Sequence, residues 1–306
     1  MSEENDDLAD LFPGFDSAYV ETGEARIFCR TGGEGPPLVL LHGYPQTHVC
    51  WHRIAPKLAE HFSLVIPDMR GYGWSSLPEA ADDHETMSKR ALARDVVALM
   101  EKLGHARFSI AGHDRGGRVA YRLALDHPGR VERIALLDIV PTLAQWESFG
   151  WRESIKTYHW PFLAQPYPLP ETLIVPSAVA YLDMTLASWT GTKSLEAFDA
   201  AAMAHYRAGY DVPERIHAMC EDYRAGATYD MAADRKDREQ GKRISVPLLA
   251  IWGESGIPAG GGDDALLNIW RQWAEDVRGH AIDSGHFLAE ENPDATLDAL
   301  MEFFSA

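Results

Sequence analysis

One short stretch decides how the rest of the chain is interpreted: Gly112-His113-Asp114-Arg115-Gly116-Gly117-Arg118. It follows an apolar run at 108–111 that predicts a strand, and it leads into a helical pattern at 117–126. Glycines two positions before and after Asp114 let the chain turn sharply from strand to helix, which lifts the central side chain out of the sheet. The stretch therefore predicts a nucleophile elbow with Asp114 as the nucleophile.

Outward from this turn, short apolar runs alternate with helical patterns. Unalternating apolar runs suit parallel strands that are buried on both faces. The segments that predict strands lie at 18–22, 25–30, 37–41, 64–66, 108–111, 133–140, 247–252 and 280–283. Further helical patterns lie at 49–60, 86–103 and 294–304. The alternation predicts an α/β fold with a mostly parallel, eight-stranded sheet flanked by helices.

The pattern changes between 141 and 242, where helical segments carry many aromatic residues and no run predicts a buried strand. Alternation of strands and helices resumes at Val246. We therefore expect one α/β-hydrolase core made of residues 1–140 and 243–306. The helical domain inserted at 141–242 is called the cap below.

Two downstream positions offer partners for the nucleophile. His286 follows the last predicted strand, which suits the chain order of nucleophile, acid and histidine. The acid has two candidate places. Asp138 ends the sixth predicted strand, whereas Asp263 and Asp264 follow the seventh only after a glycine run. We expect Asp138 to hold the tautomer of His286 and to stabilise its imidazolium.

An aspartate nucleophile favours substitution at an sp³ carbon. Its attack forms an alkyl ester and expels a leaving group, and water then cleaves the ester at the aspartate carbonyl carbon. His286 must be neutral to activate that water, so activity should fall below its pKa, roughly 6.5 for an unperturbed histidine. The backbone N–H groups of Tyr44 and Arg115 are the expected oxyanion donors.

Composition narrows the partners and cofactors. The chain has 306 residues, with 28 Lys and Arg against 46 Asp and Glu, for a net charge of −18. This balance argues against nucleic acid or an anionic membrane as a partner. An acidic start without an apolar segment, three scattered cysteines and no long apolar run predict a cytoplasmic protein. Walker, dinucleotide and HExxH motifs do not occur, so we expect no cofactor and no metal.

Four stretches, at 112–118, 158–163, 220–226 and 284–287, give the chain a family resemblance. Together they resemble the fluoroacetate dehalogenases, the haloacetate branch of the α/β-hydrolase superfamily, over nearly the whole length. The resemblance implies a substrate carboxylate site at Arg115 and Arg118. It also implies a halide site at His159, Trp160 and Tyr223, an apolar pocket wall at Trp189, and a homodimer formed through the cap.

The physical chemistry of the implied sites agrees with this expectation. Two arginines next to a helix N-terminus supply the local positive charge that an anionic substrate needs in an acidic protein. Fluoride is strongly hydrated, so its departure needs several close hydrogen-bond donors. An imidazole N–H, an indole N–H and a phenol O–H would supply three.

The expected activity is therefore hydrolytic displacement of halide, fluoride and also chloride, from a haloacetate to give glycolate. One alternative is an epoxide hydrolase with the same aspartate nucleophile and two cap tyrosines, Tyr223 and Tyr158, as acids. The paired arginines make little sense for a neutral epoxide. A second alternative is a binding protein with a decayed site, which the presence of nucleophile, acid and base argues against.

Overall fold

The computed structural model describes residues 8–78, 83–256 and 263–306, with backbone alone for 263 and 264. Eight strands form one sheet in the order β1-β2-β4-β3-β5-β6-β7-β8, in which β2 alone runs against its neighbours. The strands are β1 (Asp16–Glu21), β2 (Arg26–Gly32), β3 (Pro37–Leu41), β4 (Ser63–Pro67), β5 (Phe108–His113), β6 (Val131–Leu137), β7 (Leu248–Gly253) and β8 (Val277–Ile282). The predicted fold class is confirmed.

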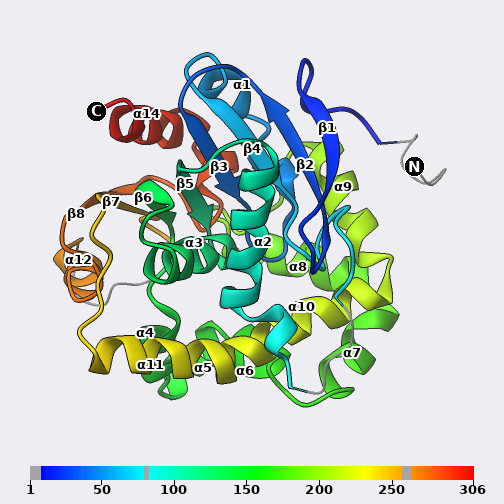
Figure 1. Cartoon of the computed structure of the whole chain (residues 1–306). Coiled ribbons are helices and arrows are strands. Elements are labelled where there is room, and N and C mark those ends of the chain that lie inside the picture. Colours follow the sequence, from blue (N-terminus) through cyan, green and yellow to red (C-terminus); the bar gives the residue numbers. More distant parts are fainter. Residues whose placement is uncertain (1–7, 79–82, 257–262) are drawn as a thin grey trace.

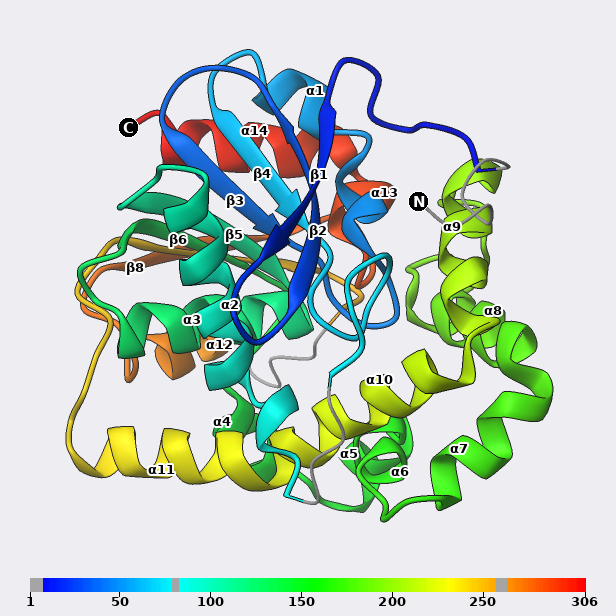
Figure 2. The same ribbon diagram turned by 45° about the vertical axis from the view of Figure 1, so that its right-hand side comes forward.

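The central strands owe their position to continuous apolar sequence. Residues 38–41 of β3 and all six residues of β7 are buried, as expected for parallel strands covered by helices on both faces. Helices α2 (Lys89–Lys102) and α3 (Arg115–Asp126) lie in front of the sheet in Figures 1 and 2, and α14 (Pro293–Phe304) lies behind it. This layering leaves the carboxyl ends of the strands to position a site.

The chain between β6 and β7 is mostly helical; in Figure 2 most of its helices lie below the sheet, and α8 and α9 lie to its right. Its helices are α4 (Thr142–Glu147), α5 (Trp151–Lys156), α6 (His159–Leu163), α7 (Leu169–Ile174), α8 (Ala178–Trp189), α9 (Ala200–Tyr210), α10 (Pro213–Ala225) and α11 (Met231–Glu239). A single π-helical turn, Gly226–Asp230, joins α10 to α11. Such turns are frequent at functional sites.

Several predicted boundaries were wrong. The helix expected at 49–60 is two short pieces, a 3₁₀ turn at His48–Trp51 and α1 (Ala55–Leu58). Proline at position 56 explains part of this, because proline favours the first turn of a helix and not its interior. Strand β6 ends at Leu137 instead of Val140, so Asp138 lies just beyond it. The remaining helices are α12 (Asp263–Trp270) and α13 (Leu288–Glu291).

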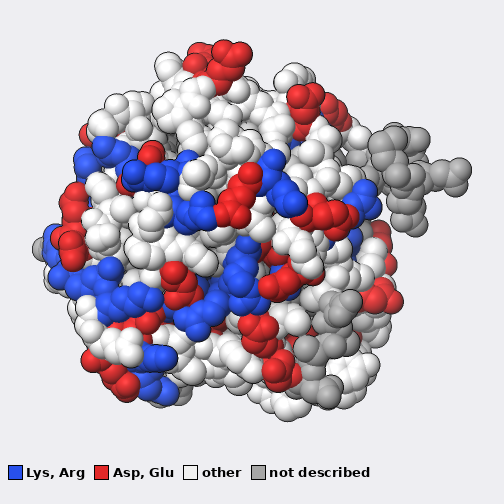
Figure 3. Space-filling view, in the orientation of Figure 1, with Lys and Arg blue, Asp and Glu red and all other residues white. Residues whose placement is uncertain are grey.

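The surface mixes both signs of charge despite the net charge of −18. Figure 3 shows basic side chains beside acidic ones on the face formed by α2 and α3. Among them Arg90 lies 2.7 Å from Asp126, and Arg94 lies 2.8 Å from Glu24. Within the described residues, no helix is both long and apolar enough to cross a membrane.

Candidate active site

Asp114 occupies a strained turn between β5 and α3. Its φ of 45° and ψ of −118° are sparsely populated for a residue with a side chain, and such strain concentrates at functional sites. The turn needs its glycines, because a Cβ on Gly116 would lie 2.2 Å from the carbonyl oxygen of His42. A Cβ on Gly112 would lie 2.6 Å from the carbonyl oxygen of Gly116. The Gly-x-Asp-x-Gly spacing is thus a requirement of the local backbone.

The structure brings Asp114, His286 and Asp138 together. Nδ1 of His286 lies 2.6 Å from Oδ2 of Asp138, and Nε2 of His286 lies 3.9 Å from Oδ2 of Asp114. The backbone N–H of Gly253, at the end of β7, donates to Oδ1 of Asp138 at 3.0 Å. Each carboxylate lies immediately beyond a strand, β5 for Asp114 and β6 for Asp138. Asp263 and Asp264, the other acid candidates, have side chains outside the described residues.

His113, the last residue of β5, contacts the loop that carries His286. Its Nε2 lies 2.7 Å from the carbonyl oxygen of His286, and the two rings lie 4.6 Å apart between centroids. Burial, aided by the charge on His286, lowers the pKa of His113 to about 4. A neutral ring with its proton on Nε2 donates to that carbonyl oxygen, which ties the loop that carries His286 to the end of β5.

The charges set the protonation states that a nucleophile and a base need. Burial alone would raise the pKa of Asp114, but His286, His113 and the two arginines outweigh it and lower that pKa. Burial alone would lower the pKa of His286, but the hydrogen bond and charge of Asp138 outweigh it and raise that pKa. Asp114 is therefore ionised and His286 titrates above its ordinary value of 6.5.

The two oxygens of Asp114 have different surroundings. Oδ1 accepts a hydrogen bond from the backbone N–H of Tyr44 at 3.0 Å, whereas Oδ2 faces His286. Gly43 permits this approach, since a Cβ there would lie 2.4 Å from Cβ of Asp114. Arg115 is the first residue of α3, so its backbone N–H has no partner within the helix. The two expected oxyanion donors thus flank the nucleophile.

Arg115 and Arg118 are both fully enclosed, with exposed fractions of 0% and 1%. The Arg115 guanidinium binds Asp222 of α10 and lies 4.2 Å above the ring of Tyr223. Nη1 of Arg118 donates to the carbonyl oxygen of Val140 at 2.8 Å, and its guanidinium lies 4.5 Å above the ring of Trp160. Nη1 of Arg115 and Nε of Arg118 have no hydrogen-bond partner.

The cap residues His159, Trp160, Tyr223 and Trp189 form one aromatic cluster over the elbow. The ring of His159 lies 4.3 Å from that of Trp189 and 5.8 Å from that of Tyr223. Burial lowers the pKa of His159 to about 3, so its ring is neutral, and burial raises the pKa of Tyr223, so its phenol keeps its proton. Nδ1 of His159 and the hydroxyl of Tyr223 are buried without a hydrogen-bond partner.

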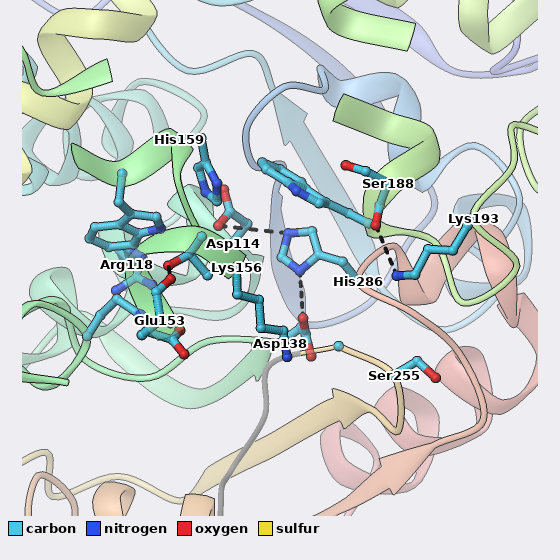
Figure 4. Close-up of a pocket in the computed structure, with 15 residues that line it drawn as sticks. Asp114, Arg118, Asp138, Glu153, Lys156, His159, Ser188, Lys193, Ser255 and His286 are labelled. Atoms are coloured by element: carbon cyan, nitrogen blue, oxygen red, sulfur yellow. Dashed lines mark hydrogen bonds and ion pairs between the residues drawn. The ribbon is translucent and has the colours of Figure 1, made fainter. Parts of the chain in front are cut away.

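A cavity of about 350 Å³ opens over Asp114 (Figure 4). Of the residues singled out in the sequence, six line it: Asp114, Arg118, Asp138, His159, Trp160 and His286, together with Trp189 as a wall. Tyr44, Arg115 and Tyr223 are not among the lining residues, but each contacts one that is: Tyr44 contacts Trp189, and Arg115 and Tyr223 contact Trp160. Sequence reasoning missed the outer lining: Gln145, Glu153, Lys156, Thr157, Ser188, Lys193, Ser255 and Gly256.

Comparison with known proteins gives one family and two chemistries. The family model described as "alpha/beta hydrolase fold" matches residues 36–293. A fluoroacetate dehalogenase from Burkholderia sp is 39% identical over 298 residues, covering 96% of this chain and 95% of its own. A soluble epoxide hydrolase from Corynebacterium sp. (strain C12) is 33% identical over 282 residues, covering 92% and 94%. A solved structure from Pseudomonas aeruginosa, provisionally named an epoxide hydrolase, is 45% identical with a TM-score of 0.91, covering 97% of each chain.

Proposed function

The chain belongs to the α/β-hydrolase family, and we propose that it is a hydrolytic dehalogenase that displaces halide from haloacetates to give glycolate. The observation that carries this proposal is a set of unpartnered buried polar atoms around an ionised carboxylate. They are Nη1 of Arg115, Nε of Arg118, Nδ1 of His159, the hydroxyl of Tyr223 and Nε2 of His286. Buried polar groups are ordinarily hydrogen-bonded, so such a set calls for a ligand with strong acceptors. A haloacetate has them at both ends, a carboxylate and a halogen.

In the first step, Oδ2 of Asp114 attacks the carbon that carries the halogen. A C–O bond forms, the carbon–halogen bond breaks, and its electron pair leaves with the halide. Oδ2 is the attacking oxygen because Oδ1 is held by the backbone N–H of Tyr44. The arginines would hold the substrate carboxylate, and His159, Trp160 and Tyr223 would receive the halide.

In the second step, Nε2 of His286 takes a proton from water, and the hydroxide attacks Cγ of the Asp114 ester. Negative charge then develops on Oδ1, which already receives the backbone N–H of Tyr44. The N–H of Arg115 is the second expected donor to that oxygen. Asp138 stabilises the imidazolium until the tetrahedral intermediate collapses. The bond from Cγ to Oδ2 then breaks, the leaving oxygen takes the proton of the imidazolium to give glycolate, and the new carboxyl group of Asp114 loses its proton to solvent.

The related epoxide hydrolases make ring opening the second candidate. A two-tyrosine mechanism would require Tyr158 to face the nucleophile alongside Tyr223. Tyr158 is instead 38% exposed and lines a separate outer hollow with Tyr181 and Met184. The position over the cavity belongs to His159. This arrangement favours the haloacid over the epoxide.

The proposal is tested by following free halide from fluoroacetate and chloroacetate, with an aryl epoxide assayed in parallel. We expect halide release from both acids. No release above the uncatalysed rate would contradict the proposal, and diol formation from the epoxide would replace it. Arg115→Lys separates the two chemistries further, because it should cripple haloacetate turnover and leave ring opening nearly intact.

We also propose the homodimer through the cap. Four large apolar side chains of the cap are strongly exposed: Trp151 69%, Ile155 70%, Leu173 60% and Met184 56%. Leu173 and Met184 line one outer hollow, and exposed apolar patches often mark interfaces between proteins. Sedimentation equilibrium should give twice the chain mass, and Ile155→Glu with Met184→Glu should return it to the monomer mass.

A further inference from the structure

A buried charge cluster lies directly behind Arg115. Asp222 of α10, Lys89 at the start of α2 and Tyr72 of the loop after β4 meet there, with exposed fractions of 0%, 1% and 0%. Asp222 belongs to the cap, whereas Arg115, Lys89 and Tyr72 belong to the core. The cluster therefore joins the cap to the core behind the cavity.

Asp222 determines how the Arg115 guanidinium is oriented. Its Oδ2 accepts from Nε of Arg115 at 3.0 Å, and its Oδ1 accepts from Nη2 at 2.7 Å. Nη2 also donates to the backbone carbonyl oxygen of Asp222 at 2.6 Å. These bonds occupy Nε and Nη2 and leave Nη1 as the nitrogen without a partner. Gly226 leaves room for Nη2 of Arg115, because a Cβ at position 226 would lie 3.1 Å from that nitrogen.

The pairing with Asp222 weakens the electrostatic attraction between Arg115 and an anionic substrate. A carboxylate held by two hydrogen bonds on a guanidinium cancels most of its charge. Arg115 paired with Asp222 alone would then attract a second carboxylate weakly. Lys89 changes the balance, since its ammonium forms an ion pair with Oδ1 of the same Asp222, and Tyr72 donates to Oδ2 at 2.9 Å.

Lys89 costs much to bury, because removing an ammonium from water is unfavourable by several kcal/mol after relaxation. Its other neighbour, Asp230, accepts the backbone N–H of Lys89 at 2.8 Å and lies 3.8 Å from its Nζ. Asp230 lies in the π-helical turn. The ammonium of Lys89 forms ion pairs with both Asp222 and Asp230. A neutral donor in place of Lys89 could satisfy the hydrogen bond to Asp222, but it would leave two buried carboxylates, Asp222 and Asp230, facing the single cation Arg115.

We propose that Lys89 is a positioning residue that, by sharing Asp222, keeps the positive charge of Arg115 available to the substrate carboxylate. Asp222 fixes the orientation of the guanidinium, and Lys89 compensates the negative charge which that orientation introduces. This inference rests on the proposed function, because it assigns Arg115 to the carboxylate of the substrate. It makes a residue that does not line the cavity a determinant of selectivity for anions.

The test compares Lys89→Gln with the double variant Lys89→Gln/Asp222→Asn. Glutamine keeps a hydrogen-bond donor for Asp222 but removes the charge. We expect Lys89→Gln to raise KM for haloacetate about tenfold with little change in kcat, since carboxylate binding is made equally in the ground and transition states. The double variant removes one cation and one anion, while one amide oxygen and the backbone carbonyl oxygen at position 222 can still accept from the Arg115 guanidinium, so KM should return to within about threefold of wild type.

Asp237→Asn is the matched control. Asp237 also joins the cap to α3 through a buried arginine, Arg122, but Arg122 lies two helical turns beyond Arg115 and does not line the cavity. This variant should lower the thermal unfolding midpoint and leave KM unchanged. A structural role for Lys89 would give the same result in Lys89→Gln and would overturn the inference.

Calorimetric binding of acetate separates this inference from the reaction. Lys89→Gln should weaken acetate binding, and the double variant should recover it, whether or not halide is released. A double variant as weak as Lys89→Gln would contradict the charge-sharing role. A wild-type protein that binds acetate yet releases no halide would contradict the proposed function alone. Should Lys89→Gln fail to fold, acetate affinity of the double variant close to that of wild type supports the inference, and a tenfold loss contradicts it.

Discussion

The two walls of the cavity are built in opposite ways. On the core side, the backbone N–H groups of Tyr44 and Gly253 donate to Asp114 and Asp138, and the ring of His113 contacts the carbonyl oxygen of His286. On the cap side, His159 and Tyr223 have buried polar atoms without a partner. The two core carboxylates have backbone donors without a ligand, whereas these polar atoms of His159 and Tyr223 would gain partners only from one. We infer that the core supplies the reaction and the substrate carboxylate site, and the cap the halide site.

Removing the nucleophile should have the largest effect. Asp114→Asn cannot form the ester, so halide release should fall by at least about 10⁴-fold. The fold should survive, because the amide oxygen can still accept the N–H of Tyr44. Halide release and the circular dichroism spectrum check the two statements. Activity within about tenfold of wild type would place the nucleophile elsewhere.

Asp138→Asn tests the core side of the cavity through its effect on His286, the proposed base. The amide no longer fixes the His286 tautomer, and turnover should fall by about 10⁴-fold. Wild-type activity needs neutral His286, whose pKa is raised above 6.5, so it should be lost as pH falls through that raised value. Without the charge of Asp138 the acidic limb of the residual activity should move to lower pH. A pH–rate profile that does not move would contradict this role for Asp138.

Tyr223→Phe tests the donors that the cap contributes. Losing one donor to the departing halide should slow fluoroacetate turnover by about 10²-fold. Bromoacetate should lose less, because bromide needs less stabilisation as it leaves. Tyr158→Phe is the matched control and should alter neither rate, since Tyr158 lines the outer hollow. Equal losses of turnover with fluoroacetate and bromoacetate would contradict a role for Tyr223 in binding the departing halide.

We expect the smallest effect at the outer edge of the cavity, at Lys193. Lys193 is exposed, lines the outer cavity, and donates from Nζ to the carbonyl oxygen of Ser188 at 2.9 Å. Lys193→Gln should lower kcat/KM for haloacetate by about twofold to threefold at low ionic strength, and the difference should vanish at high salt. Lys57→Gln, an exposed lysine outside the cavity lining, makes the same charge change and should have no effect.

The core wall could be predicted from the sequence because short-range rules determine it. Two glycines two residues either side of Asp114 define the elbow, and strand ends place Asp138 and His286 at one edge of the sheet. The helix predicted at 49–60 was wrong because its apolar spacing ignored the proline at position 56.

The cap wall could not be predicted from local pattern. His159 and Tyr223 have the spacing of ordinary packed aromatics, and only the family resemblance singled them out. The cluster behind Arg115 was missed because Lys89 and Asp222 are 133 residues apart and meet only in the folded chain. Lys156 and Lys193 were missed because exposed lysines occur on every protein surface.

The most direct measurement is the intact mass of His286→Asn after incubation with fluoroacetate. Oδ2 of Asp114 needs no base to attack carbon, whereas hydrolysis of the ester needs Nε2 of His286. We expect one carboxymethyl group per chain, located on Asp114 by peptide mapping, with one fluoride released. An unmodified chain, or a modification on another residue, would contradict it.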